Sequence, residues 1–144
     1  MPDIMHLVTI NAAPDYVFDA LATENGIRGW WTSDANLDPR VGGKGEFRFY
    51  GGSKITIVEV TELHRPRRVG WKVLRSFRPE WESTTISFDL QTLDGGTKLR
   101  FAHLGFPRAD DDYAICTTGW GLYLASLKTF LENQVVDTRS DDAK

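Results

Sequence analysis

His103 and Cys116 are the side chains of this sequence whose placement best suits acid–base or nucleophilic chemistry. In the segment KLRFAH, alternation puts His103 on one strand face with Leu99 and Phe101, so we expect its imidazole to point inward. A buried imidazole needs a hydrogen-bond partner, and it acts either as a structural group or as a general acid–base. Cys116 lies on an apolar helical stripe, which favours a buried thiol over a nucleophile. His103 is therefore the one catalytic candidate.

Metal, cofactor and phosphate sites gain no support from residue spacing. The three histidines lie tens of residues apart and form no HxH, HxxxH or HExxH pattern. One cysteine is too few for an internal disulfide or a thiolate cluster. The segment VGGKG at 41–45 lacks the spacing of a phosphate-binding loop and precedes an expected strand instead of a helix. We expect no metal ion and no cofactor.

The charge balance argues against a nucleic-acid partner. The 144 residues include 17 Lys and Arg against 20 Asp and Glu, for a formal net charge of −3. A basic cluster at 65–78 is interleaved with aromatic residues, but strand alternation places Lys72 on the face opposite Trp71. We interpret the cluster as a solvated outer face, with an anionic ligand group or an acidic partner surface as the alternative.

The sequence pattern also shows no targeting signal. The first residues show no basic region followed by an apolar stretch, and no run of 18 apolar residues occurs anywhere. We therefore expect no integral membrane span. Together with the single cysteine, this pattern favours a cytoplasmic location.

The elements that must position these residues follow from periodicity and turn signals. We expect a strand at 4–11, two short helices ending near Trp31, a loop at 32–45, five further strands, and a long helix from about Asp112 to Gln134. Gly119 and Gly121 flank Trp120 in that helix, which indicates close approach, spare space beside the ring, or chance placement near the helix start. The order predicts one domain over 1–136 and a polar tail at 137–144.

This element order predicts an α+β fold. Six antiparallel strands would form a sheet curved around the long C-terminal helix, with the two short helices after the first strand. A curved sheet cannot touch a straight helix everywhere, so a cavity between them is expected.

Four ordered motifs, DPRVGGKGEF, VEVTELHRPRRVGW, DGGTKLRFAHLGF and GWGLYLASLKTFL, together with a pair of tryptophans near the second helix, carry a family resemblance. Between about Val8 and Leu131 the sequence resembles the AHSA1-like branch of the START/Bet v 1 (SRPBCC) superfamily. The resemblance implies a helix-grip fold with a deep cavity for a hydrophobic molecule.

Aromatic residues are abundant, with five Trp, four Tyr and eight Phe, and their faces predict a ligand-binding set between sheet and helix. The alternative is that the same rings fill a solid core. The predicted set is Trp30, Trp31, Phe47, Phe49, Trp71, Trp81, Phe88, Phe101, His103, Phe106, Trp120, Tyr123, Leu124 and Leu127.

Three functions remain open at this stage. The first is binding or carriage of a small hydrophobic molecule, lipid-like or aromatic, without catalysis. The second is a cyclase or aromatase, which would need His103 or Glu59 to face a wet pocket. The third is an Hsp90-co-chaperone-like interaction module, which the resemblance implies and which would use an exposed aromatic patch near Trp30 and Trp31. An edge strand or the Trp pair would also support a homodimer.

Overall fold

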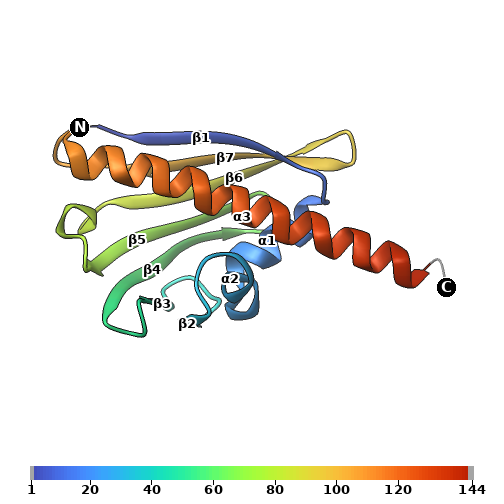
Figure 1. The fold of residues 1–144 in the computed structure, drawn as a ribbon, viewed down its shortest axis with the longest axis horizontal. Coiled ribbons are helices and arrows are strands. Elements are labelled where there is room, and N and C mark those ends of the chain that lie inside the picture. Colours follow the sequence, from blue (N-terminus) through green and yellow to red (C-terminus); the bar gives the residue numbers. More distant parts are fainter. Residues whose placement is uncertain (1, 143–144) are drawn as a thin grey trace.

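The computed structural model describes residues 2–142 and shows one antiparallel sheet with a long helix beside it (Figure 1). The strand order across the sheet is β1-β7-β6-β5-β4-β3-β2. The strands are β1 (Ile4–Ile10), β2 (Asp34–Leu37), β3 (Lys44–Phe49), β4 (Lys54–His64), β5 (Arg68–Ser76), β6 (Thr85–Leu93) and β7 (Gly96–Leu104). The register of β4 shifts at two points, which locally bends that strand.

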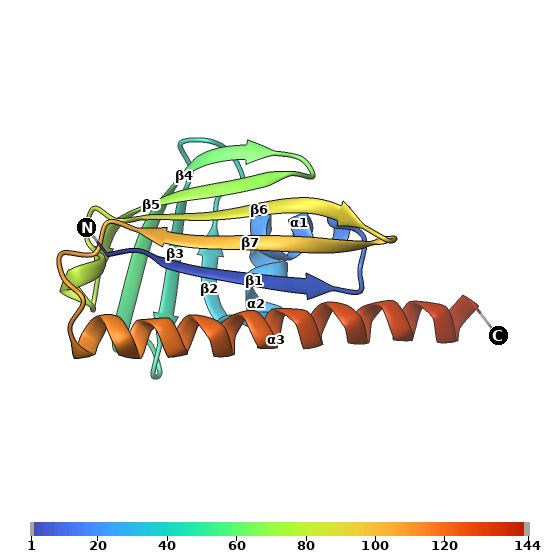
Figure 2. The ribbon, with the colours of Figure 1, turned by 90° about the horizontal axis from the view of Figure 1, so that it is seen from above.

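The helices lie to one side of the sheet. They are α1 (Pro14–Ala22), α2 (Glu24–Trp30), the 3₁₀ helix η1 (Pro79–Trp81) and α3 (Asp111–Asp142). Seen from above, the first part of α3 runs alongside β1, the rest of the helix extends past the end of that strand, and α1 and α2 lie behind the sheet (Figure 2). The expected pair of short helices after the first strand is thus confirmed.

Local sequence explains where the two short helices begin. Pro14 occupies the first turn of α1, where its missing N–H costs nothing. The Thr23 hydroxyl caps α2 by accepting a hydrogen bond of 3.0 Å from the Gly26 amide. This cap holds the chain where it turns from α1 into α2, and so it sets the direction in which α2 leads toward Trp31.

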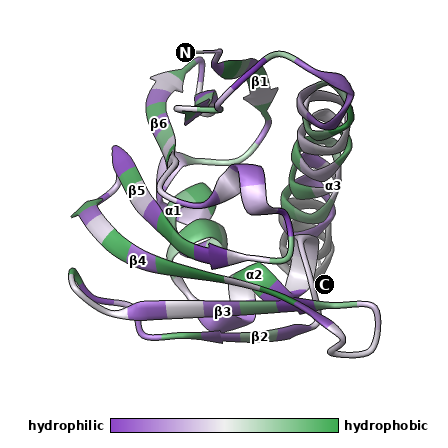
Figure 3. Ribbon diagram, turned by 90° about the vertical axis from the view of Figure 1, so that its left-hand side faces the viewer, coloured by the Kyte–Doolittle hydropathy of each residue, from purple (hydrophilic) through white to green (hydrophobic). Residues whose placement is uncertain are grey.

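The core occupies the concave side of the sheet. Hydrophobic and hydrophilic residues alternate along β4 and β5, and the sheet curves around the space next to α3 (Figure 3). Along α3 the predicted stripe is buried as expected, at Cys116, Trp120, Leu124, Leu127 and Leu131. The predicted α+β architecture with a long C-terminal helix is therefore confirmed.

Two predicted boundaries are wrong. The sheet has seven strands instead of six, because β2 lies within the segment expected to be a loop. Its sequence, DANL, has low strand propensity, and it forms by pairing with β3 at the sheet edge. Helix α3 continues to Asp142 instead of ending near Gln134, so residues 137–142 of the predicted tail extend the helix. The remaining tail positions, 143–144, lie outside the described residues.

Candidate ligand-binding cavity

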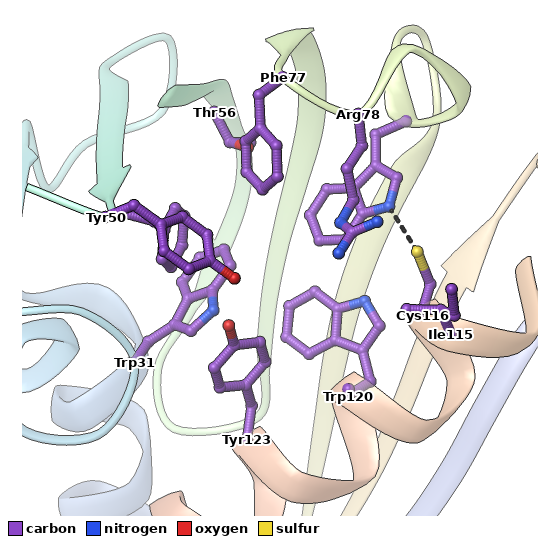
Figure 4. Close-up of a pocket in the computed structure, with 12 residues that line it drawn as sticks. Trp31, Tyr50, Thr56, Phe77, Arg78, Ile115, Cys116, Trp120 and Tyr123 are labelled. Carbon is purple, nitrogen blue, oxygen red and sulfur yellow. Dashed lines mark hydrogen bonds between the residues drawn. The ribbon is translucent and has the colours of Figure 1, made fainter. Parts of the chain in front are cut away.

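A cavity of about 90 Å³ lies between the first half of α3 and the ends of β3, β4 and β5. Figure 4 shows its lining side chains converging from the sheet, from the end of α2 and from α3. The twelve lining residues are Trp31, Phe49, Tyr50, Thr56, Phe77, Arg78, Trp81, Ile115, Cys116, Gly119, Trp120 and Tyr123.

Aromatic rings form most of the cavity wall. The ring of Trp31 lies 5.3 Å from that of Trp120 and 5.6 Å from that of Phe49, measured between centroids. Trp81 stacks on Trp120 with centroids 5.6 Å apart and planes inclined by 14°. Such ring pairs contribute contact energy beyond the area they bury, which gives the cavity stiff, flat walls.

Trp31 contributes a buried hydrogen-bond donor, its indole N–H, to this wall. Its side chain is 7% exposed, and among the described side chains its Nε1 is the one buried polar atom without a hydrogen-bond partner. The Tyr123 hydroxyl is close enough for the indole N–H to influence its pKa, although the two make no hydrogen bond of normal geometry. Burial is the larger effect and raises the pKa of Tyr123, so its phenol stays neutral and can both donate and accept.

His103 lies under the cavity wall and holds it in place. The Trp120 indole donates to His103 Nδ1 at 3.0 Å, and His103 Nε2 lies 2.8 Å from the Thr84 hydroxyl. The Thr84 hydroxyl in turn donates to the carbonyl of Trp81. Burial lowers the pKa of His103 to about 3, so the imidazole is neutral at physiological pH and both nitrogens are engaged.

Cys116 lines the cavity as a thiol. Its Sγ accepts a hydrogen bond of 3.2 Å from the Trp81 indole, drawn as a dashed line in Figure 4. Burial raises the pKa of the thiol, outweighing the opposite effects of Trp81 and Arg78. The predicted buried thiol is confirmed, and nothing in its surroundings generates a thiolate near neutral pH.

Neither a metal centre nor a membrane-spanning helix is evident in the described part of the chain. No group of three or more His, Cys, Asp or Glu side chains is placed to hold a metal ion there. Within the same residues, no helix combines the length and apolar character needed to cross a membrane.

Comparison with known proteins places the chain in a family. A family model described as "Activator of Hsp90 ATPase homolog 1-like protein" matches residues 11–132. The chain belongs to this family. No curated protein matches the sequence of this AHSA1 family member. Solved structures do match it.

Solved structures agree with the assignment to the AHSA1 family and its Bet v 1-like fold. The Aha1 dimer from Colwellia psychrerythraea is 36% identical, with a TM-score of 0.82 over 92% of this chain and 97% of that chain. A protein from Mesorhizobium loti is 21% identical, with a TM-score of 0.80 over 92% and 98% of the two chains. One from Nitrosomonas europaea is 19% identical, with a TM-score of 0.76 over 93% and 96%. The latter two share the fold.

The cavity of this AHSA1 family member brings together part of the predicted ligand-binding set. Trp31, Phe49, Trp81, Trp120 and Tyr123 line it. The other members of the set pack in the buried core outside the lining: Trp30, Phe47, Trp71, Phe88, Phe101, His103, Phe106, Leu124 and Leu127. Both alternatives thus apply, since most rings fill the core and the rest surround one space.

The prediction of an exposed aromatic patch at Trp30 and Trp31 is wrong. The two side chains are 4% and 7% exposed because Trp30 donates to the Ala20 carbonyl at 2.8 Å and Trp31 packs against the sheet. Glu59 also lies away from the cavity, since its neighbours Val58 and Val60 take the inward face of β4.

Sequence reasoning missed the cavity residues that lie at strand ends and turns. Tyr50, Phe77 and Arg78 occupy connections, where alternation no longer gives a direction, and Thr56 looked like an ordinary strand residue. The glycine beside Trp120 was the available signal. Gly119 does line the cavity, and a Cβ built there meets no atom within 4 Å.

Proposed function

We propose that the protein binds a small hydrophobic molecule, lipid-like or aromatic, in the cavity between the sheet and α3. The observation that carries this proposal is the ring-walled space, beside which the buried Trp31 indole N–H makes no hydrogen bond of normal geometry. Leaving a buried donor unpaired costs about 1–3 kcal/mol, so a ligand or water that accepts from it is favoured.

The walls support a flat or flexible apolar ligand. Apolar surface removed from water contributes about 25 cal/mol per Å², and stacked rings present that surface with little conformational freedom to lose. Tyr50 and Ile115 at the rim are 76% and 55% exposed. A ligand longer than the enclosed space would therefore extend between these two side chains.

Tryptophan fluorescence tests the proposal directly, because Trp31, Trp81 and Trp120 line the cavity. We expect saturable quenching or a spectral shift with members of a panel of fatty acids, flavonoids and polyketides. Gly119→Leu should weaken binding by at least about tenfold, equivalent to 1.4 kcal/mol, by filling the space. Ala125→Leu, at an exposed position of the same helix, is the matched control and should bind normally.

The proposal fails if no compound of the panel changes the fluorescence, or if Gly119→Leu binds as well as the unaltered protein. Thermal unfolding of both variants shows whether they fold. A cyclase or aromatase role receives no support from the cavity, since His103 and Glu59 are both absent from its lining.

We also infer that the chain forms a homodimer. The supporting observations are the dimeric Colwellia relative and the exposure of Met5 and Leu7, at 68% and 57%, on the edge strand β1. Light scattering during size-exclusion chromatography should give twice the chain mass, and Leu7→Lys should give the mass of one chain. A monomeric unaltered protein would contradict this inference.

A further inference from the structure

The cavity has a distinct electrostatic character. Arg78 is the one charged side chain among the twelve lining residues, and no carboxylate lines the space. The nearest ion-pair partner of Arg78 is Glu80, whose Oε1 lies 3.9 Å from Nη1, beyond hydrogen-bond distance. By contrast, Arg68 on the outer face lies 2.6 Å from carboxylate oxygens of both Glu62 and Asp89. Arg78 therefore pairs with Glu80 without a hydrogen bond, and among the described residues no hydrogen bond engages its guanidinium N–H groups.

Other donors gather opposite this guanidinium. In Figure 4 the hydroxyls of Tyr50 and Tyr123 point toward each other beside the Trp31 indole nitrogen, and Arg78 faces the same space. The Arg78 charge extends across the cavity, because it lowers the pKa of Cys116 and of Tyr123 against the larger effect of burial. The lining thus combines a cation, a buried N–H and two hydroxyls with flat apolar walls.

A second positively charged side chain, that of Lys54, lies near the rim of the cavity. Lys54 Nζ lies 5.5 Å from the centre of the Tyr50 ring and 5.4 Å from that of Phe77. Arg78 itself lies over Phe77, with its guanidinium carbon 5.3 Å from the ring centre. These contacts hold both cations near the opening, where they would attract an anion and disfavour a cationic ligand.

We propose that the cavity selects apolar molecules that carry a carboxylate, whose oxygens accept hydrogen bonds from Arg78 and from the Trp31 and tyrosine donors. This inference rests on the proposed function and specifies the ligand's polar end. A carboxylate suits the site because it accepts from several donors at once and pairs with a guanidinium in plane. The apolar body would lie against Trp31, Trp81 and Trp120.

Matched acids and esters test the proposal. The probes are 1-naphthoic acid with its methyl ester and dodecanoic acid with its methyl ester, titrated at pH 7.5 by calorimetry and tryptophan fluorescence. A charge-assisted hydrogen bond should make at least one acid bind about tenfold or more tightly than its ester. The pair that shows the preference tells whether the acid is aromatic or fatty.

Arg78→Gln should weaken binding of the acid more than binding of its ester, and so should reduce the acid–ester ratio toward one. Arg100→Gln makes the same chemical change at an exposed position on the other face of the sheet and should keep the preference. Esters that bind as tightly as acids overturn this inference and leave the proposed function intact. Failure of all four compounds to bind also overturns this inference, whereas the proposed function is decided by the wider panel of fatty acids, flavonoids and polyketides. The acid–ester comparison uses the unaltered protein, so it decides the question even if a variant does not fold.

Discussion

Trp120 donates its indole N–H to Nδ1 of His103 across 3.0 Å, and this bond determines the state of the imidazole. An indole N–H can only donate, so Nδ1 must accept and the single proton of the neutral ring lies on Nε2. That proton is directed at the Thr84 hydroxyl, 2.8 Å away. His103 thereby orients Trp120 at the cavity wall without reaching the cavity, which makes it a positioning residue.

The buried imidazole predicts a loss of stability in mild acid. The pKa of His103 is about 3 in the folded protein and about 6.5 when unfolded, so between these values the unfolded chain binds the extra proton. The free energy of unfolding should fall by about 1.4 kcal/mol from pH 7.5 to 5.5 through this group. In His103→Gln this contribution should vanish. Urea denaturation of both proteins at the two pH values measures it, and equal losses would contradict the prediction.

Cys116 should react slowly with thiol reagents. Burial raises the pKa of its thiol, so the thiolate fraction is low. The residue is 3% exposed, so a reagent also has little access to the sulfur. At pH 8 we expect the native protein to react with a disulfide reagent at least about tenfold more slowly than the protein in denaturant. Absorbance of the released thiolate follows the reaction. Equal native and denatured rates would show that the thiol is accessible.

Gly26→Ala should destabilise the fold. An added Cβ would lie 2.4 Å from the Asp19 carbonyl oxygen and 2.5 Å from the Ala20 Cα, where α2 crosses the end of α1. Because both obstacles are backbone atoms, the helices must move apart, at a cost of about 1–3 kcal/mol. Chemical denaturation should show this as a lower midpoint at unchanged slope. An unchanged midpoint would mean that the crossing is looser than the structure indicates.

Gly119→Ala should have the opposite effect. The position lies within α3, where alanine is favoured over glycine by up to about 1 kcal/mol, and the added Cβ meets nothing within 4 Å. The same denaturation experiment should show a higher midpoint. A destabilised Gly119→Ala would indicate that the chain needs this glycine for reasons other than open space.

Much of the architecture could be predicted because period and turn chemistry are local properties. The alternation in β1 and the four- and three-residue steps from Cys116 to Leu131 identify buried faces without knowledge of the partner element. The short strand β2 could not be predicted in this way. Its residues Asp34 and Asn36 disfavour strands, and the hydrogen bonds to β3 that form it are made only when the sheet edge is in place.

The site was predictable to a smaller extent. Sequence alone determined that Trp120 and Tyr123 face inward from the long helix and that Trp31 and Trp81 end their segments beside the sheet. Only the tertiary structure decided which rings fill the core and which surround a space, since Phe88 and Trp120 are both buried but only Trp120 borders the cavity.

The charge of the cavity is likewise a tertiary property. The sequence by itself determined a curved sheet, a long helix and an excess of rings between them, because hydrophobic periodicity acts through local geometry. The position of Arg78 across the cavity from Trp31 and Tyr123 depends on how two connections, after α2 and after β5, meet α3 at one end of the sheet. Side-chain directions in turns depend on these tertiary contacts and follow no sequence period. Only the folded chain therefore shows that the Arg78 guanidinium faces an aromatic cavity.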